Sequence, residues 1–265
     1  MSSPLEKKPK VALVYDRVNT RYGGAEQVLV QLHTIFPEAP LFTSVFDPKK
    51  AKWSADFTVF PSFIQRIPIL KNFHRAAVFL MPLAFERANL KSFDIIISVT
   101  SAEAKGVLTS PDQLHVCYLL TPTRYLWSHQ DEYEKDVLTG WLRKLIFRYL
   151  KWWDEAAAFR PDVIIPISKL VQERTEQYYH RKTLPVIYPP VSFTNLTEES
   201  SEVSEKESAD DPSSSEVEFP HDYYLIVARL VSYKRLDIAI KACQKLNRKL
   251  IIIGEGPDKK RLQKR

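Results

Sequence analysis

The chain has 265 residues, of which 45% are hydrophobic and 26% charged, with a net charge of +6. This length allows one large domain or two of ordinary size with a real core, and no apolar run approaches the ~20 residues that would span a bilayer. The N-terminus lacks the apolar core of a signal peptide, and two isolated cysteines fit a reducing compartment better than a disulfide or a metal site. We therefore expect a cytoplasmic globular protein with no metal.

The first strong pattern is a strand that leads into a glycine turn and then a helix. Residues 11–15 are almost all apolar, as in a parallel strand buried on both faces. Gly23 and Gly24 follow, with a helix expected from Ala25 onward. Glycines let a ligand approach the backbone, and a helix N-terminus favours an anion. A phosphate is the ligand expected at this turn, although a turn that merely needs glycine is the structural alternative.

A second strand is expected at residues 40–46, ending at Asp47, with a further short strand at residues 56–60. An acid about 20 residues after a glycine turn is also the feature that binds a ribose hydroxyl in dinucleotide folds. This makes an NAD-dependent oxidoreductase with Asp47 on the ribose an alternative. It is disfavoured because the turn is Gly-Gly-Ala-Glu and because Asp47 precedes Pro48, a common turn pair.

Residues 62–86 combine apolar and basic side chains with prolines that divide the segment into short helices. Such a segment could lie on a membrane surface. The favoured alternative is that these helices pack their apolar side on the sheet and leave the charges in water.

The next strands are expected at residues 93–99 and 114–120. The loop 121–127, Thr-Pro-Thr-Arg-Tyr-Leu-Trp, follows the second of them, at the strand end where α/β proteins place functional residues. Arg124 is the candidate anion contact in this loop. An arginine that covers Trp127 is the structural alternative.

A long helix is predicted at residues 141–159, where Leu142, Leu145, Ile146, Tyr149 and Trp153 recur at helical spacing and favour core packing over membrane docking. A strand at 163–167, a helix at 169–179 capped by Ser168, and a last strand at 185–188 complete the region. Alternating strands and helices predict a doubly wound parallel sheet, a Rossmann-like domain over residues 1–191.

Residues 195–219 hold nine acidic residues and seven serines against one lysine. With little to bury, the segment 192–220 is expected to be a disordered linker or insertion. The rest of the chain holds 37 basic and 23 acidic residues, a balance that suits phosphorylated ligands or anionic lipids. No nucleic-acid motif accompanies it.

The chain then restarts as strand, turn and helix, with strands expected at 223–228 and 250–253 and a Gly-Glu-Gly-Pro turn at 254–257. About 45 residues with two strands are too few for an independent core. We therefore expect residues 221–265 to be the incomplete start of a second Rossmann-like domain, in a fragment of a longer protein.

Several stretches together are similar to the retaining GT-B glycosyltransferases of family 4, which include many mannosyltransferases. The resemblance covers the first domain and the opening of the second. The matching stretches are Tyr22-Gly23-Gly24-Ala25-Glu26, Asp94 to Ser98 with Ala104-Lys105-Gly106, residues 121–127, Ile187 to Val191, Arg229-Leu230 to Lys234-Arg235, and Ile252 to Pro257.

The resemblance implies roles for individual residues. Arg229 and Lys234 match the cations that hold the donor diphosphate, without a metal or cofactor, and Gly254 and Gly256 match a turn that lines the nucleotide. The turn formed by Gly23, Gly24 and Glu26, together with Thr121 and Arg124, would serve donor phosphates or the acceptor. Two features depart from the family. Leu120 stands where relatives often carry a histidine, and His115 lies on the opposite face of the same strand, while the family's paired glutamates would fall after Arg265.

The activity implied is transfer of a hexose, with mannose as the candidate, from a nucleotide-diphosphate sugar to a lipid-linked or polysaccharide acceptor at the cytoplasmic membrane face. A non-catalytic remnant of such an enzyme is the alternative that Leu120 and the short second domain favour.

Overall fold

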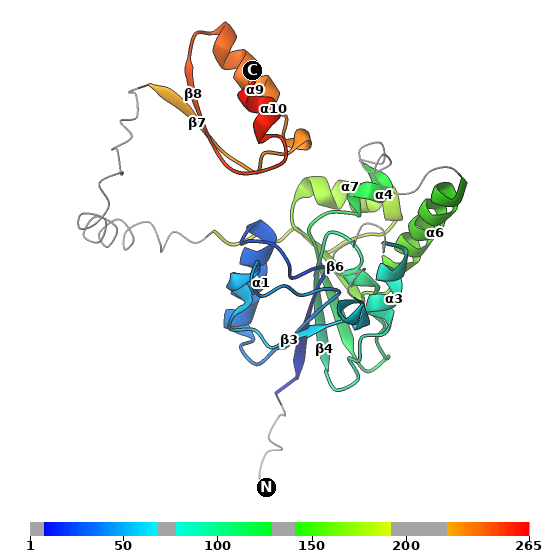
Figure 1. Ribbon diagram of the computed structural model, residues 1–265. Helices are drawn as coiled ribbons and strands as arrows, with labels where there is room; N and C mark the ends of the chain where they lie inside the picture. The colour runs from blue at the N-terminus through cyan, green and yellow to red at the C-terminus, as the bar shows by residue number, and fades with distance from the viewer. Residues whose placement is uncertain (1–7, 68–77, 129–140, 192–221, 265) are drawn as a thin grey trace, which may run out of the picture. The chain divides into compact units, whose positions relative to one another are not determined.

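The computed structural model describes residues 8–67, 78–128, 141–191 and 222–264 (Figure 1). The chain divides into two compact units, Met1–Ser192 and Phe193–Arg265. The acidic tract and residues 68–77 of the apolar, basic segment lie outside the described residues.

The first unit is built on a six-stranded sheet in the order β3-β2-β1-β4-β5-β6, and every neighbouring pair is parallel. This is the strand order of the Rossmann fold, whose topological switch point lies between β1 and β4. The strands are β1 (Val11–Tyr15), β2 (Leu41–Thr43), β3 (Val59–Pro61), β4 (Ile95–Thr100), β5 (Leu114–Leu119) and β6 (Val163–Pro166).

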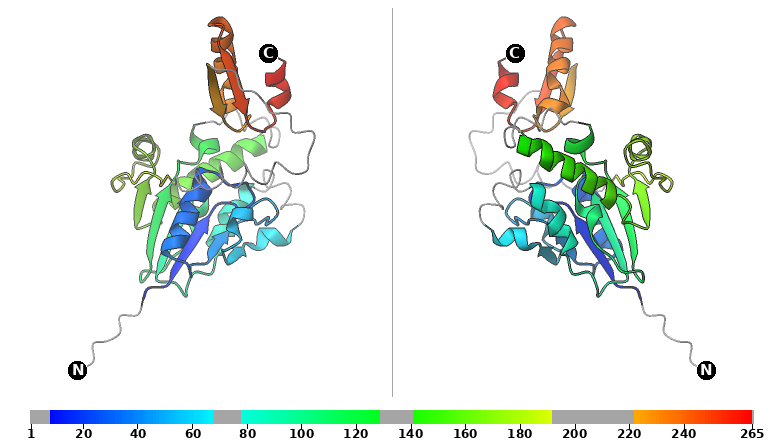
Figure 2. Two further views of the ribbon diagram at one scale, coloured as in Figure 1. Left: turned by 90° about the vertical axis from the view of Figure 1, so that its left-hand side faces the viewer. Right: turned by 90° about the vertical axis from the view of Figure 1, so that its right-hand side faces the viewer.

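Helices cover both faces of this sheet, as the two views of Figure 2 show. Leu13 and Tyr15 face α1, whereas Ala12 and Val14 pack with residues of α3. Cys117 and Ile164, on the same face as Val14, pack with α7. The helices are α1 (Gly24–Ile35), α3 (Met81–Glu86), α4 (Arg124–Trp127), α6 (Trp141–Ala157) and α7 (Lys169–Tyr179), with short 3-10 turns at Lys52–Ser54, Phe63–Arg66, Val78–Leu80 and Ala104–Gly106.

Most of the expected elements are present, and the predicted bounds of α7 are confirmed. Its cap is also confirmed, because the Ser168 side chain accepts a hydrogen bond from the Val171 amide. The strand expected at residues 185–188 is wrong. The amides of Leu184 and Ile187 reach β6 carbonyls, but the segment has no strand geometry, because Pro185 supplies no amide hydrogen for a continuous ladder.

The expected core face of α6 is wrong in part. Trp153 is buried and Ile146 half-buried, but Leu145 and Tyr149 are 44% and 45% exposed. The side chain of Leu142 lies outside the described residues. The helix instead buries the face that carries Leu150, Trp153, Asp154 and Ala157.

Within its described residues, 222–264, the second unit contains one pair of parallel strands, β7 (Tyr223–Val227) and β8 (Lys249–Ile253). The helices α9 (Leu236–Lys245) and α10 (Lys259–Gln263) accompany it, with a 3-10 turn at Ser232–Lys234. Its buried cluster consists of Leu230, Leu236 and Leu262. Tyr224, Leu225 and Val227 of β7 are 50–71% exposed, so the strand pair gains little from burial.

The difference in burial predicts unequal resistance to protease. Each large apolar side chain left in water forgoes roughly 1.5–3 kcal/mol of burial, so the second unit should open far more often than the first. Limited proteolysis of the 265-residue chain should therefore cut residues 192–265 first and leave a stable product that ends near Pro190. Equal resistance of residues 223–264 and of the first unit would contradict this expectation.

Candidate functional site

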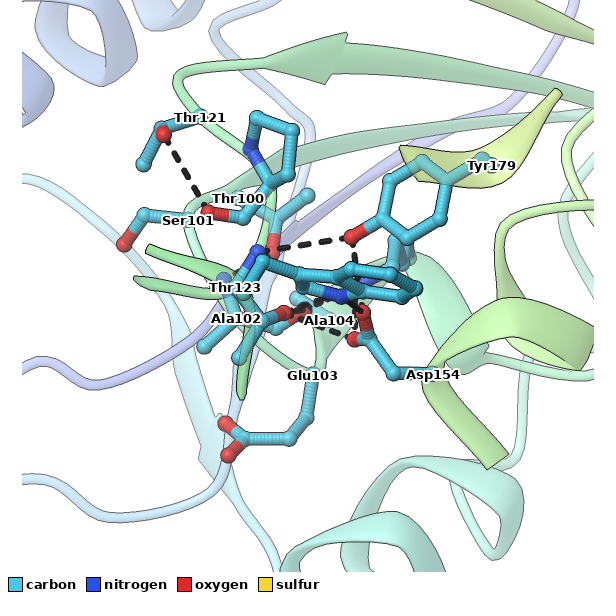
Figure 3. A network of polar contacts seen from close by, with 12 residues as sticks. Thr100, Ser101, Ala102, Glu103, Ala104, Thr121, Thr123, Asp154 and Tyr179 are labelled. Atoms are coloured by element: carbon cyan, nitrogen blue, oxygen red, sulfur yellow. Dashed lines mark hydrogen bonds and ion pairs between the residues drawn. The ribbon is translucent and has the colours of Figure 1, made fainter. Parts of the chain in front are cut away.

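The Asp16 carboxylate follows β1 and lies at the switch point, where it binds the turn after β4. Oδ1 accepts hydrogen bonds from Thr100 Oγ1 at 2.7 Å and from the Ala104 amide at 2.9 Å, and Oδ2 accepts from the Ser101 amide at 2.7 Å. Figure 3 shows the turn 100–104 that supplies these donors. Asp16 is 5% exposed, and its bonds fix the ends of two adjacent strands to each other.

Arg17 and Glu103 form an ion pair at the same edge. Arg17 Nη2 lies 3.1 Å from Glu103 Oε2, and the Tyr125 hydroxyl donates to Glu103 Oε1 at 2.5 Å. Burial raises the pKa of Glu103, and the neighbouring Arg17 offsets this only in part. The Glu103 side chain is 2% exposed and that of Arg17 26%. Arg17 is therefore the member of this pair that a ligand can reach.

The glycine turn before α1 contains a buried carboxylate of its own. Glu26, 7% exposed in the first turn of the helix, accepts hydrogen bonds from the Tyr15 and Thr20 hydroxyls, each at 2.9 Å. Burial and the nearby Glu26 raise the pKa of Tyr15. A negative charge thus already occupies the helix N-terminus, where it is favoured by the dipole. A phosphate at this turn would meet like charge.

The two glycines of this turn differ in what surrounds them. A Cβ on Gly23 would lie 2.9 Å from Glu26 Oε2, whereas a Cβ on Gly24 would meet nothing within 4 Å. Packing therefore explains glycine at the first position. At the second position the open space leaves the backbone accessible to a ligand.

The loops after β4 and β5 are held by one buried ion pair. Lys105 Nζ lies 2.5 Å from Asp154 Oδ1, and each side chain is 1% exposed. Thr123 Oγ1 also donates to Oδ1 at 2.7 Å, while Trp127 Nε1 and the Tyr179 hydroxyl donate to Oδ2 at 2.8 and 2.7 Å. In Figure 3 Asp154 faces Thr123 and Tyr179. The carboxylate thus accepts four hydrogen bonds.

The loop 121–127 accordingly has a structural side and an exposed side. Thr121 is buried and donates to the Pro122 carbonyl, and Thr123 and Trp127 belong to the Asp154 network. Arg124 begins α4 with an exposed side chain. It stays the candidate anion contact of this loop, and the ring of Trp127 is covered by Lys151, whose Nζ lies 4.3 Å from the ring centroid.

Leu120 and His115 occupy opposite faces of the sheet, as their spacing predicts. Leu120 packs against the apolar cluster on the α1 face. His115 is fully buried on the other face, and its Nε2 lies 2.9 Å from Ser98 Oγ. The position at which the family that the sequence resembles often carries a histidine is therefore apolar here, and His115 lies on the other face of the sheet.

In the second unit, Arg229 and Lys234 meet at one tyrosine. Arg229 Nη2 donates to the Tyr233 hydroxyl at 3.0 Å, and Lys234 Nζ lies 5.8 Å from the centroid of the same ring. Both cations are exposed. Within residues 222–264 neither forms an ion pair with an acid.

The turn 254–256 supports the loop that carries these cations. A Cβ on Gly254 would lie 1.9 Å from the Ala228 carbonyl oxygen, and one on Gly256 would lie 2.2 Å from that of Leu230. The Glu255 carbonyl accepts the Leu230 amide at 2.9 Å. Close backbone packing therefore accounts for both glycines. The role that the resemblance gives them, lining a nucleotide, stays a prediction.

Asp47 is engaged locally. Its Oδ1 accepts the Lys49 amide at 3.2 Å, and its Oδ2 lies 3.5 Å from Lys50 Nζ. These contacts are those of a turn, so the structure adds no support for the NAD-dependent alternative.

Titration of the chain with NAD distinguishes an oxidoreductase from a glycosyltransferase. Micromolar binding of NAD without any response to nucleotide sugars would favour the oxidoreductase.

A separate hollow of about 300 Å³ opens beside the ends of β2 and β3, lined by apolar side chains that include Phe42, Phe60, Phe63 and Phe85, with Arg87 and Asn89. Within the described residues no three or more metal-binding side chains are grouped to hold an ion. No helix in the described part is long and apolar enough to cross a membrane.

Sequence reasoning singled out the loops of this site but missed most of the charges that organise it. Asp16, Arg17, Glu103 and Asp154 each pair with at least one residue more than 30 positions away. Asp16 could have been found as the polar residue that ends a buried strand. Asp154, in the sequence Trp-Trp-Asp-Glu, has no comparable signal.

No protein-family model matches the chain, and no curated protein matches it either. Among solved structures, the chain is similar to the apo form of the lipopolysaccharide outer core galactosyltransferase WaaB, with 17% identity and a TM-score of 0.47 over 96% of this chain and 63% of that one. The wall teichoic acid polymerase TagF is 12% identical, with a TM-score of 0.46 over 95% of this chain and 57% of that one. The glycotransferase of kitacinnamycin is 10% identical, with a TM-score of 0.41 over 94% of this chain and 66% of that one.

The chain thus spans 57% to 63% of the length of the first two structures. Every one of these TM-scores lies below 0.5.

The Lys105–Asp154 pair predicts a large loss of stability when one partner is removed. Lys105→Met leaves the Asp154 charge buried without its counter-ion and should lower the free energy of unfolding by about 3–5 kcal/mol. The Asp47–Lys50 pair, whose Lys50 side chain is 69% exposed, is the control, since Lys50→Met should leave the free energy of unfolding almost unchanged. Urea unfolding of both variants measures the difference, and equal small losses would contradict the structural role of the buried pair.

His115 predicts a pH dependence of stability. Burial lowers the pKa of His115 to about 4 from its ordinary value of 6.5, which we take for the unfolded chain. The nearby Asp162 carboxylate raises this pKa, and the Arg181 guanidinium lowers it. The folded state keeps the imidazole ring neutral, whereas the unfolded chain takes up a proton below pH 6.5. The stability of the fold is therefore greatest above pH 6.5 and decreases as the pH falls from 6.5 toward 4. Wild type should lose about 2 kcal/mol more than His115→Gln between pH 7 and pH 5. Urea unfolding at each pH measures this difference. If the free energy of unfolding changed equally with pH in both proteins, the buried neutral state of His115 would be contradicted.

Proposed function

We propose that this chain belongs to a glycosyltransferase that moves a hexose, with mannose as the candidate, from a nucleotide-diphosphate sugar to a lipid-linked or polysaccharide acceptor. The observation that carries the proposal is the pair of exposed cations in the second unit. Arg229 and Lys234 contact one tyrosine and have no acidic partner within the described part of that unit. Two unneutralised cations suit a diphosphate.

Glycosyl transfer from a nucleotide-diphosphate sugar is assisted by positive charge near the diphosphate. When the bond between the sugar and the diphosphate breaks, negative charge develops on the leaving oxygen. Preorganised cations that contact this oxygen stabilise the transition state more than the ground state. Arg229 can bind two phosphate oxygens through its fork of donors, whereas Lys234 contributes a point charge. The pair thus supplies the stabilisation that a metal ion gives in other transferases.

The first unit fits a ligand with hydroxyl groups better than a phosphate. Glu26 sits at the glycine turn, and Arg17 is already paired with the buried Glu103. Carboxylates accept hydrogen bonds from hydroxyls and repel anions. We therefore assign the acceptor to the edge around Gly24 and Arg17. Arg124, exposed at the start of α4, is the candidate contact for an anionic group of that acceptor.

The proposal includes three further points: retention of anomeric configuration, membership of family 4 and a place at the cytoplasmic membrane face. They are supported by the resemblance of the sequence motifs. A donor screen with product analysis tests the stereochemistry, and robust transfer with inversion would exclude the retaining mechanism.

Binding of nucleoside diphosphates tests the donor site directly. Arg229→Ala and Lys234→Ala should each weaken the affinity of the chain for nucleoside diphosphates such as UDP or GDP at least about tenfold, because each removes a charge-assisted contact to phosphate. Isothermal titration across the common nucleoside diphosphates gives the affinity and identifies the base.

Lys245→Ala is the matched control, since Lys245 is an exposed lysine at the end of α9 in the same unit. Its affinity should equal that of wild type. If Lys234→Ala and Lys245→Ala change binding equally, or if no nucleoside diphosphate binds to wild type, the assignment of the donor site fails.

A further inference from the structure

The helix α6 exposes a row of large apolar side chains along one side. Trp141, Leu145, Tyr149 and Trp152 are 74%, 44%, 45% and 63% exposed. They are spaced three and four residues apart, and at 3.6 residues per turn this spacing places them on one face. Tryptophan and tyrosine predominate, the side chains that favour the boundary between water and lipid.

Basic side chains lie along one border of this row. Lys144 and Arg148 are exposed, and Lys151 is half-buried beside Trp127. In the helical projection they follow one another next to Trp141 and Trp152, with Glu155 as the exposed acid among them. The face is thus aromatic along its centre and basic along one side.

The opposite face of α6 fixes the orientation of this row. Leu150, Trp153, Asp154 and Ala157 are buried, and Asp154 is held by the Lys105 network. A Cβ on Gly106 would lie 2.4 Å from the Trp153 ring, so the helix packs closely there. The aromatic row therefore cannot turn inward. Figures 1 and 2 show α6 along a flank of the first unit.

We propose that this face of α6 docks the protein on an anionic lipid bilayer, with the helix parallel to the surface. The aromatic rings enter the interfacial region, and the lysines and the arginine contact lipid phosphates. A second copy of the chain is a poorer occupant, because an antiparallel two-fold contact would bring the basic borders of two α6 helices toward each other. The inference concerns α6 alone and does not depend on the proposed transfer reaction.

Vesicle sedimentation of the full chain tests the proposal. Wild type should sediment with vesicles of phosphatidylcholine and phosphatidylglycerol, and much less with phosphatidylcholine alone. Trp141→Ala combined with Trp152→Ala should weaken binding at least about tenfold. Lys144→Glu combined with Arg148→Glu should remove the preference for the anionic vesicles.

Two further variants make the test specific. Ile35→Ala with Leu170→Ala removes side chains that are 64% and 53% exposed on α1 and α7, and its binding should equal that of wild type. Ile67→Ala probes the other apolar, basic segment and should also bind normally. Thermal unfolding should show all variants folded, since every altered side chain is exposed.

The proposal is overturned if the double tryptophan variant binds vesicles as wild type does, or if wild type binds neither kind of vesicle. It is also overturned if Ile67→Ala abolishes binding while the tryptophan variant does not. Dimers of wild type that the tryptophan variant cannot form, without vesicle binding, would assign the face to a second copy instead.

Discussion

The carboxylate of Asp154 is the interaction on which the functional edge of the first unit depends. It lies on α6 and accepts hydrogen bonds from Lys105 after β4, from Thr123 and Trp127 after β5, and from Tyr179 at the end of α7. Removing a carboxylate and an ammonium from water costs several kcal/mol per ion, which good geometry and full hydrogen bonding must offset. Here four donors converge on one acceptor group, so two loops and two helices hold a single arrangement at the end of the sheet.

This arrangement leaves only some of the conspicuous residues available for chemistry. Thr123 and Lys105 are prominent in the motifs, yet both are fully buried in the network. Asp16 similarly binds the turn after β4. What remains near the surface is Arg17, the open backbone at Gly24 and Arg124. Rigid buried polar groups thus position a small set of accessible ones, as a preorganised binding site requires.

The sequence could predict the sheet and the location of the site because both follow from local patterns. Unbroken apolar runs identify buried parallel strands, and polar loops at their carboxyl ends identify the ligand edge. The pairing of charges is not local. Asp154 meets Lys105 across 49 positions, and no spacing rule connects them. The strand expected at 185–188 failed for a related reason, because apolar composition was right while Pro185 lacked the donor that a ladder needs.

The helix α6 shows how periodicity can identify a stripe without saying what covers it. Trp152 and Trp153 are adjacent in the sequence, yet one is 63% exposed and the other 4%. The helix has apolar residues on both sides. Asp154 determines which side is buried, because its carboxylate must reach Lys105. Once that ion pair is satisfied, Trp153 is pressed against Gly106 and Trp152 is left in water. The buried ion pair that organises the functional edge therefore also determines which aromatic surface the protein presents outward.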